Sequence, residues 1–330
     1  MNNFKKIGMT ALAASLVSTS VFAGEMAVTG SAAINFENYT GSEMSSTKSF
    51  SMGNQLTFSG SGELDNGMTV ALSFVLDQGD EGAAGSQADS PFDSHSVSIS
   101  SDALGTLVFH GEGGDSAQNA VGDTAAGNIW DNFDGRTTGN ATLKESNATT
   151  DMIHYTLPNF VEGVAVSASY VPSGGTDQSD SAYAIVYTGL EGLTASYGQG
   201  SSDQQAAGLG ASTADADTTS MKVSYVIGSI TAAYSSHDHD HGTATSGQEA
   251  TSWKLSYTVS DAISISYGHE TIDSKETADS SDAEFSKIAG SYTSGGMTVS
   301  ASFQDGENMS YTTATSEDEE YYGLSLSFAF

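Results

Sequence analysis

The segment His237-Asp-His-Asp-His241 alternates imidazole and carboxylate groups. Both groups are ligands for zinc, nickel or copper. The segment follows a predicted strand at 229–236 and begins a long polar loop, where an exposed and flexible stretch is the commoner structure. His237, His239 and His241 are therefore only weak candidates for a metal site.

Carboxylates are the most abundant ionisable groups of the chain. There are 41 Asp and Glu residues against 9 Lys and Arg, which gives a net charge of -32. This balance excludes a nucleic-acid binder, which needs clustered cations to contact phosphates. Acidic loops such as Glu317-Asp-Glu-Glu320 could hold calcium loosely, but the spaced ligands of an EF-hand are absent. We expect that no cofactor is required.

Catalytic motifs are missing from the sequence. Ser and Asp are so frequent that a Ser/His/Asp combination means nothing without geometry. Neither a Gly-x-Ser-x-Gly elbow nor a P-loop occurs. The chain has no Cys, which excludes thiol catalysis and a disulfide scaffold. The sequence does not predict an enzyme.

The first residues have the order of a secretory signal peptide. Lys5 and Lys6 precede an apolar run from Ile7 to Val17, and small residues end the segment at Ala23. The apolar run is too short to cross ~30 Å of hydrocarbon. We expect cleavage after Ala23, which leaves 24–330 as a single exported domain.

Period-two alternation dominates the remaining chain. Between 49 and 65 every second residue is mostly apolar, as at Phe50, Met52 and Leu56, and the residues between them are polar. Asn66-Gly67 then predicts a tight hairpin turn. The same test predicts sixteen strands, near 26–36, 49–65, 67–78, 94–101, 105–111, 151–157, 163–171, 181–188, 192–198, 218–227, 229–236, 250–259, 262–270, 283–292, 297–304 and 321–330.

The connections and side chains of these strands favour a membrane barrel. Tight turns alternate with long polar loops, which is typical of an antiparallel outer-membrane barrel with an even number of strands. An outward Lys at the bilayer midplane would cost ~2–4 kcal/mol, so ionisable strand residues should fall in the polar phase. The ionisable residues that fall in the polar phase are predicted to line the inner wall. They are Glu63, Asp77, His110, His154, Lys222, Lys254 and Lys287.

The last strand, 321–330, ends in an aromatic residue. Its outward phase includes Tyr322, Phe328 and Phe330, and this terminus resembles the signature that the barrel-assembly machinery recognises in outer-membrane barrels. Leu104-Gly-Thr-Leu-Val-Phe-His-Gly111 and Ile153-His-Tyr-Thr-Leu-Pro-Asn-Phe160 are similar to segments on either side of the third loop of porins. The chain thus resembles the Gram-negative general diffusion porins, particularly the alphaproteobacterial type.

The resemblance implies an all-β, sixteen-stranded transmembrane barrel in the outer membrane, usually a homotrimer. Its surroundings would be outer-membrane lipid and lipopolysaccharide, and its passengers ions and small hydrophilic solutes that diffuse passively. The longest gap between strands, 112–150, corresponds to the third loop, which folds inward and narrows the pore in that family. Its candidate constriction residues are Glu112, Asp115, Asp123, Asp131, Asp134 and Arg136.

The tip of this loop would be 128–135, with Trp130 and Phe133 pinning it to the wall. Its sequence departs from the Pro-Glu-Phe-Gly-Gly-Asp tip of enteric relatives. Acids on the loop and lysines on the wall would make a transverse field, and the charge excess predicts a preference for cations. The alternative for 112–150 is an exposed acidic surface loop.

A different function remains open at this point. An acidic surface adhesin, or a calcium-dependent interaction protein of β-helix or sandwich fold, would also be exported and rich in Asp. Such a chain should show short regular repeats or Asp-Gly nonapeptides. This sequence has none.

Overall fold

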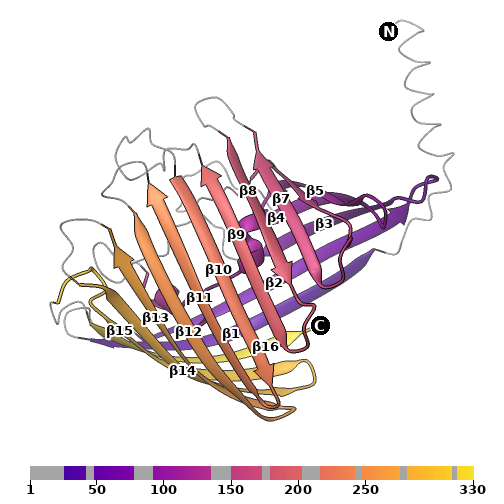
Figure 1. Ribbon diagram of the computed structural model, residues 1–330. Coiled ribbons are helices and arrows are strands. Elements are labelled where there is room, and N and C mark those ends of the chain that lie inside the picture. Colours follow the sequence, from indigo (N-terminus) through magenta and orange to yellow (C-terminus); the bar gives the residue numbers. More distant parts are fainter. Residues whose placement is uncertain are drawn as a thin grey trace, which may run out of the picture.

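The structure is a computed structural model that describes residues 26–41, 48–77, 92–134, 150–172, 179–202, 216–241, 247–275, 281–313 and 318–330. Sixteen strands in these residues form one closed antiparallel barrel, in which each strand pairs with its sequence neighbours and β16 pairs with β1 (Figure 1). The predicted all-β barrel of sixteen strands is confirmed. The predicted signal peptide, 1–23, lies outside the described residues.

Two short 3-10 helices, η1 and η2, interrupt the connection between β5 and β6. In chain order the elements are β1 Ala27–Gly41, β2 Lys48–Glu63, β3 Thr69–Asp77, β4 Ser94–Ser101, β5 Gly105–Glu112, η1 Ala117–Val121, η2 Ile129–Phe133, β6 Met152–Thr156, β7 Val164–Val171, β8 Asp180–Tyr187, β9 Leu193–Ser202, β10 Ala216–Ile227, β11 Ile230–His241, β12 Gln248–Ser260, β13 Ile263–Ser274, β14 Ala283–Ser294, β15 Met297–Glu307 and β16 Glu319–Ala329.

The predicted turn at Asn66-Gly67 is present between β2 and β3. Gly67 has φ +79°, a left-handed conformation that an L side chain would strain. The backbone N–H of Met68 donates to the side-chain oxygen of Asn66 over 3.1 Å. These local contacts set the register of β2 against β3, so that Leu56 faces Leu76 and Phe58 faces Phe74.

The strands separate an apolar outer face from a more polar inner face. On β8, Tyr183 and Ile185 point outward and are exposed, while Ala182 and Ala184, which alternate with them, are buried. Many other large apolar side chains are exposed on the outer face, which marks contact with an apolar phase. No helix among the described residues is long and apolar enough to cross a membrane.

The barrel closes between the first and last strands. Ser31 faces Ala329 at one end of the β1–β16 ladder and Gly41 faces Glu319 at the other. One residue beyond, Gly30 and Phe330 exchange two backbone hydrogen bonds of 2.8 and 3.0 Å. A Cβ on Gly30 would lie 2.6 Å from a ring carbon of Phe330, so a larger residue there would displace this ring.

Candidate functional site

The connection between β5 and β6 folds into the barrel. Its two helices contact the inner wall, η1 mainly at β8 and β9 and η2 at β13, β14 and β15. In Figure 1 they are purple coils inside the ring of strands. Ala117 and Ile129 are fully buried there. The predicted inward-folded loop is therefore present, and the alternative of an exposed surface loop is wrong for 112–134; residues 135–149 lie outside the described residues.

Inward-facing serines of the wall hold the loop backbone and side chains. Serine suits this position because its short hydroxyl lets the loop approach closely and still satisfies buried N–H groups. The hydrogen bonds run from Ala117 N to Ser169 Oγ (2.8 Å), Gln118 Nε2 to Ser220 Oγ (2.9 Å), Ala125 N to Ser235 Oγ (2.8 Å) and Ala126 N to Ser252 Oγ (2.9 Å). The loop thus follows the inner wall from β7 to β12.

Glu270 of β13 fastens the second half of the loop. Its side chain accepts a hydrogen bond from the Thr124 hydroxyl on one oxygen and from the backbone N–H of Trp130, over 3.2 Å, on the other. Only 1% of Glu270 is exposed. A buried carboxylate is unfavourable unless its oxygens are paired, and the loop supplies both partners. Glu270 is therefore a positioning residue for the loop.

The loop tip is anchored by apolar contacts inside the barrel. The ring of Phe133 packs against Phe285 of β14 with centroids 5.6 Å apart, and both side chains are 1% exposed. Ile129 and Met309 belong to the same cluster, and Trp130 packs against it while partly exposed. This arrangement places Trp130 and Phe133 where they pin the loop to the wall. Asn132 adds a hydrogen bond of 3.0 Å from its Nδ2 to Gln304 Oε1.

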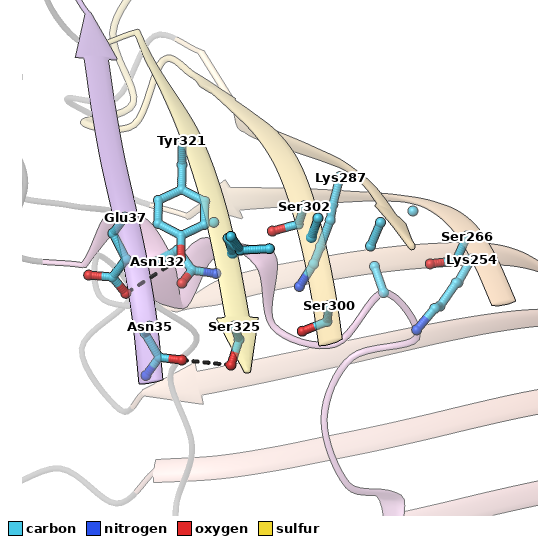
Figure 2. Close-up of a pocket in the computed structure, with 16 residues that line it drawn as sticks. Asn35, Glu37, Asn132, Lys254, Ser266, Lys287, Ser300, Ser302, Tyr321 and Ser325 are labelled. Carbon is cyan, nitrogen blue, oxygen red and sulfur yellow. Dashed lines mark hydrogen bonds between the residues drawn. The ribbon is translucent and has the colours of Figure 1, made fainter. Parts of the chain in front are cut away.

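A polar cavity of about 430 Å³ lies beside the loop tip (Figure 2). The loop contributes Ala126 and Asn132, and the wall from β12 around to β1 contributes the rest. The charged wall residues are Lys254, Lys287 and Glu37. The uncharged polar ones are Asn35, Ser266, Ser300, Ser302, Tyr321 and Ser325.

The three wall lysines have different surroundings. Lys222 donates a hydrogen bond of 2.8 Å from its Nζ to the backbone oxygen of Asp123 in the loop. Lys254 and Lys287 line the cavity and are close enough to repel each other electrostatically. Neither has a hydrogen bond or ion pair with another described residue. On β1, Glu37 accepts a hydrogen bond of 2.9 Å from Ser49 Oγ and one of 3.5 Å from the Tyr321 hydroxyl.

The acids that the sequence assigned to the constriction lie elsewhere on the same loop. Asp115, Asp123, Asp131 and Asp134 are exposed, Glu112 ends β5, and none of them lines the cavity beside the tip. The carboxylates of Asp115 and Asp123 accept hydrogen bonds from Asn119 (3.3 Å) and Asn128 (3.2 Å). Arg136 lies outside the described residues.

The remaining predicted wall residues lie away from the cavity. His154 Nδ1 is 3.0 Å from the backbone oxygen of Asp115, at the start of the loop. His110 lies beside it, where a Cβ on Gly114 would be 2.7 Å from the His110 ring. Glu63 and Asp77 end β2 and β3 and are exposed.

Sequence reasoning missed two carboxylates of the site: Glu37, which lines the cavity, and Glu270, which holds the loop. Each stands in the polar phase of its strand, next to the outward residues Phe36 and His269 respectively. Their position in the polar phase was the only signal that the sequence offered. It could not show that Glu37 reaches the cavity and that Glu270 reaches the loop.

The expectation of an exposed histidine loop was wrong. β11 continues to His241 instead of ending at 236, and the side chains of His237 and His239 point inward with 3% and 7% exposed. Their Nδ1 atoms bond to Ser220 Oγ (2.9 Å) and Thr218 Oγ1 (2.8 Å) on β10. Each cross-strand bond satisfies the Nδ1 atom of one imidazole, and these bonds hold residues with low strand propensity in the strand. The side chain of His241 lies outside the description.

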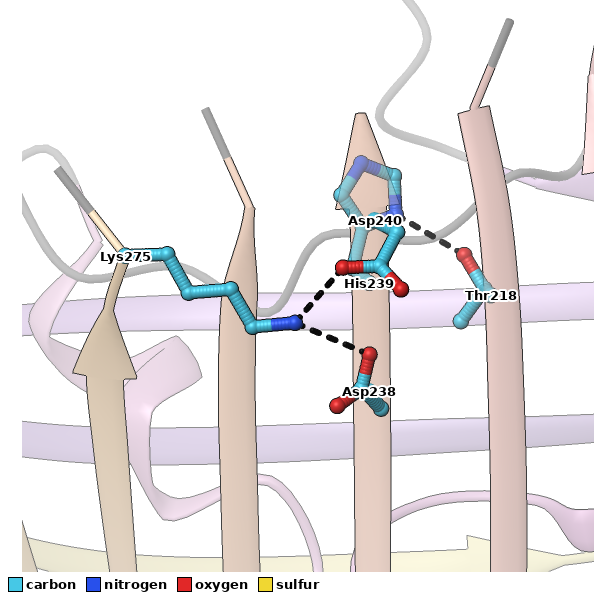
Figure 3. A network of polar contacts seen from close by, with 5 residues as sticks. All are labelled: Thr218, Asp238, His239, Asp240 and Lys275. Carbon is cyan, nitrogen blue, oxygen red and sulfur yellow. Dashed lines mark hydrogen bonds and ion pairs between the residues drawn. The ribbon is translucent and has the colours of Figure 1, made fainter. Parts of the chain in front are cut away.

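The acids of the same segment face the opposite way. Lys275, just after β13, donates to Asp238 (3.0 Å) and Asp240 (2.7 Å) on the outer face (Figure 3). Burial opposes the charge of Lys275, but these hydrogen bonds prevail and raise its pKa. Because alternate residues of a strand point to opposite faces, the His and Asp side chains do not converge on one ion. Among the described residues, no three His, Cys, Asp or Glu side chains form a possible metal site, so loose calcium binding finds no support there.

Comparison with known proteins agrees with this architecture. The family model described as Gram-negative porin matches residues 8–330. No curated protein matches the sequence. Among solved structures, the anion-selective porin from Comamonas acidovorans is 15% identical, with a TM-score of 0.67, and the match covers 93% of this chain and 100% of that one.

Two further structures show the same fold. Salmonella typhi OmpF, in a complex with daunomycin, is 12% identical with a TM-score of 0.68, over 92% of this chain and 98% of that one. A mutant of the Rhodobacter blastica porin is 14% identical with a TM-score of 0.65, over 93% and 100%. The closed barrel excludes the β-helix and sandwich alternatives. By its family match over nearly the whole length, the chain belongs to the Gram-negative porins and is an outer-membrane diffusion channel, not an enzyme.

Proposed function

We propose that this porin passes ions and small hydrophilic solutes passively and prefers cations. The observation that carries the preference is the charge: without residues 1–23 the chain keeps 7 Lys and Arg (9 minus Lys5 and Lys6) against 41 acids. A pore with a negative summed potential concentrates cations at its mouths. The Comamonas acidovorans relative is described as anion-selective, so the fold alone does not decide the sign.

We place the narrow part of the channel where the loop lies on the wall. On the loop side, the proposed residues are Glu112, Asp115, Asp123, Asp131, Asp134 and Arg136. On the wall side they are Glu63, Asp77, His110, His154, Lys222, Lys254 and Lys287, to which Glu37 is now added. The exposed loop acids and the hydrogen bond between Lys222 and the loop support this placement.

A KCl gradient across a planar bilayer tests the ion preference. We expect a reversal potential of the sign that potassium permeation produces. Changing Asp131 and Asp134 together to Asn should lower the potassium-to-chloride permeability ratio about two-fold, because exposed charges in water each contribute a few tenths of a kcal/mol. Asp238→Asn with Asp240→Asn is the matched control, since these acids lie on the outer face. Anion preference in the unmodified porin would refute the proposal, and an unchanged ratio in the loop variant would remove these two acids from the ion path.

We further propose a homotrimer in outer-membrane lipid and lipopolysaccharide, whose subunits meet along the part of the wall that has the shortest strands. Strands β4 to β8 have only 5 to 8 residues, whereas a tilted membrane strand needs about 9–11. A neighbouring subunit would cover the outer face of these short strands. The exposed terminus with Tyr322, Phe328 and Phe330 is proposed as the signal for the barrel-assembly machinery.

Mass spectrometry of protein extracted from outer membranes tests the assembly. Native spectra should show three chains, and denatured spectra should give the mass of residues 24–330, because cleavage is proposed after Ala23. Deleting Phe330 should strongly reduce the trimer in the outer-membrane fraction, whereas deleting Met26, at the opposite terminus of the described barrel, should not. A monomer, an uncleaved chain or normal assembly without Phe330 would each contradict the corresponding proposal.

A further inference from the structure

The cavity beside the loop tip carries two cations without a described partner. Lys254 comes from β12 and Lys287 from β14, and both line the cavity. Their ammonium groups repel each other. In the described part of the chain, no hydrogen bond or ion pair offsets that repulsion. Like charges held together are stabilised when an anion binds between them.

The acids nearest these lysines are already occupied or distant. Glu270 attracts Lys287, but its two oxygens are bonded to Thr124 and Trp130 of the loop, and it does not line the cavity. The carboxylate of Asp123 accepts a hydrogen bond from Asn128 and does not line the cavity. The charges that face the cavity itself are therefore two ammonium groups and one carboxylate, Glu37.

Glu37 lies on the other side of the cavity. Figure 2 shows Glu37 and Asn35 on β1 at one side, Lys287 near the centre and Lys254 at the far side. Around the barrel, three strand spacings separate β1 from β14 and two more separate β14 from β12, or about 14 Å and about 10 Å between backbones at 4.7–4.9 Å each. All three charged side chains line the same cavity of about 430 Å³, a volume within the range of sites that bind small molecules. The hydroxyls of Ser300 and Ser302 line the space near Lys287 and offer further hydrogen bonds.

We propose that this cavity is a binding subsite for small acidic amino acids such as glutamate. The two carboxylates of the solute would bind at Lys254 and Lys287, and its ammonium group would bind at Glu37. The charges of such a solute, two negative and one positive, mirror those of the lining. The inference rests on the proposed position of the constriction, and it adds a preferred class of solute to an otherwise general channel.

Current block in planar bilayers tests the subsite on the unmodified trimer. Glutamate, glutarate and glutamine are added to a fixed KCl solution, and the fall in ionic current is followed against concentration. Glutarate lacks the ammonium group and glutamine lacks one carboxylate. We expect half-block by glutamate at a concentration about ten-fold lower than for either analogue, since one favourable charge pair in a partly desolvated site contributes roughly that factor. Equal block by all three solutes overturns the proposal.

Variants of the lining residues provide the second arm. Lys254→Gln with Lys287→Gln should raise the glutamate concentration for half-block at least about ten-fold, because both carboxylate partners are lost. Glu37→Gln should remove the difference between glutamate and glutarate. Lys275→Gln, at the outer face, should leave the block unchanged. Retained glutamate preference in the lining variants overturns the subsite.

The KCl conductance of each variant is recorded first, without any solute. A steady open-channel conductance of any size shows that the barrel has assembled, so a lost block then reports on the cavity and not on folding. A porin that conducts KCl but shows no glutamate preference leaves the channel function standing. The lysine variants could instead conduct KCl with the glutamate block and the ion preference both unchanged. This result would show that the constriction lies elsewhere.

Discussion

Replacing Glu270 with alanine is expected to turn the steady open current of this porin into a fluctuating one. The change removes both acceptors that hold Thr124 and the Trp130 N–H. Hydrogen bonds to a charged group contribute about 1.5–3 kcal/mol each, so the loop loses at least about 3 kcal/mol of attachment. Loop states away from the wall should then be populated on the order of a hundred-fold more often.

Single-channel recordings at constant voltage measure this effect directly. Glu270→Gln should be milder, because glutamine keeps the shape and one acceptor oxygen. Glu284→Ala is the matched control, since it removes a carboxylate of β14 that faces outward near His269. The barrel should survive in all three variants, because the serine contacts and the Phe133–Phe285 packing remain. A steady single-channel current through the Glu270→Ala variant would show that the carboxylate does not hold the loop.

Reversing the charge of the two cavity lysines is expected to increase the cation preference several-fold. Lys254→Glu with Lys287→Glu changes the charge of the cavity lining by four units at the loop tip. A unit charge about 4 Å from an ion in water contributes about 1 kcal/mol, which is about a five-fold change in the potassium-to-chloride permeability ratio. We therefore expect an increase of at least about five-fold for the pair.

Reversal potentials in KCl gradients of low and high concentration measure the ratio. The effect should shrink in 1 M salt, because the Debye length falls from about 10 Å at 0.1 M to about 3 Å. Lys275→Glu serves as the control because Lys275 pairs with Asp238 and Asp240 on the outer face. A ratio that does not respond to the cavity variants would mean that ions bypass this cavity.

The strand pattern of the sequence was sufficient for the barrel and for the face of each side chain. Alternation follows from the geometry of the extended backbone, which each strand obeys on its own. For this reason Lys222, Lys254 and Lys287 could be placed on the inner side before any contact was known. The rule did not help at 237–241. This segment continues the strand, but the residues of both its faces are polar, so the sequence predicted a loop.

What the sequence could not show is which inner residues meet. Tyr39, Asn132 and Gln304 lie far apart in the chain, yet Asn132 accepts a hydrogen bond from the Tyr39 hydroxyl (2.9 Å) and donates one to Gln304 (3.0 Å). Those contacts exist only because β1 pairs with β16 and the loop turns inward.

The sequence by itself therefore determined an exported, acidic, sixteen-stranded barrel with polar side chains inside, since composition and alternation are local properties of the chain. The tertiary structure alone decided that Glu270 holds the loop and that Glu37 shares a cavity with Lys254 and Lys287. The physical reason is that closure of the ring brings residues from opposite ends of the chain within a few strand spacings of each other.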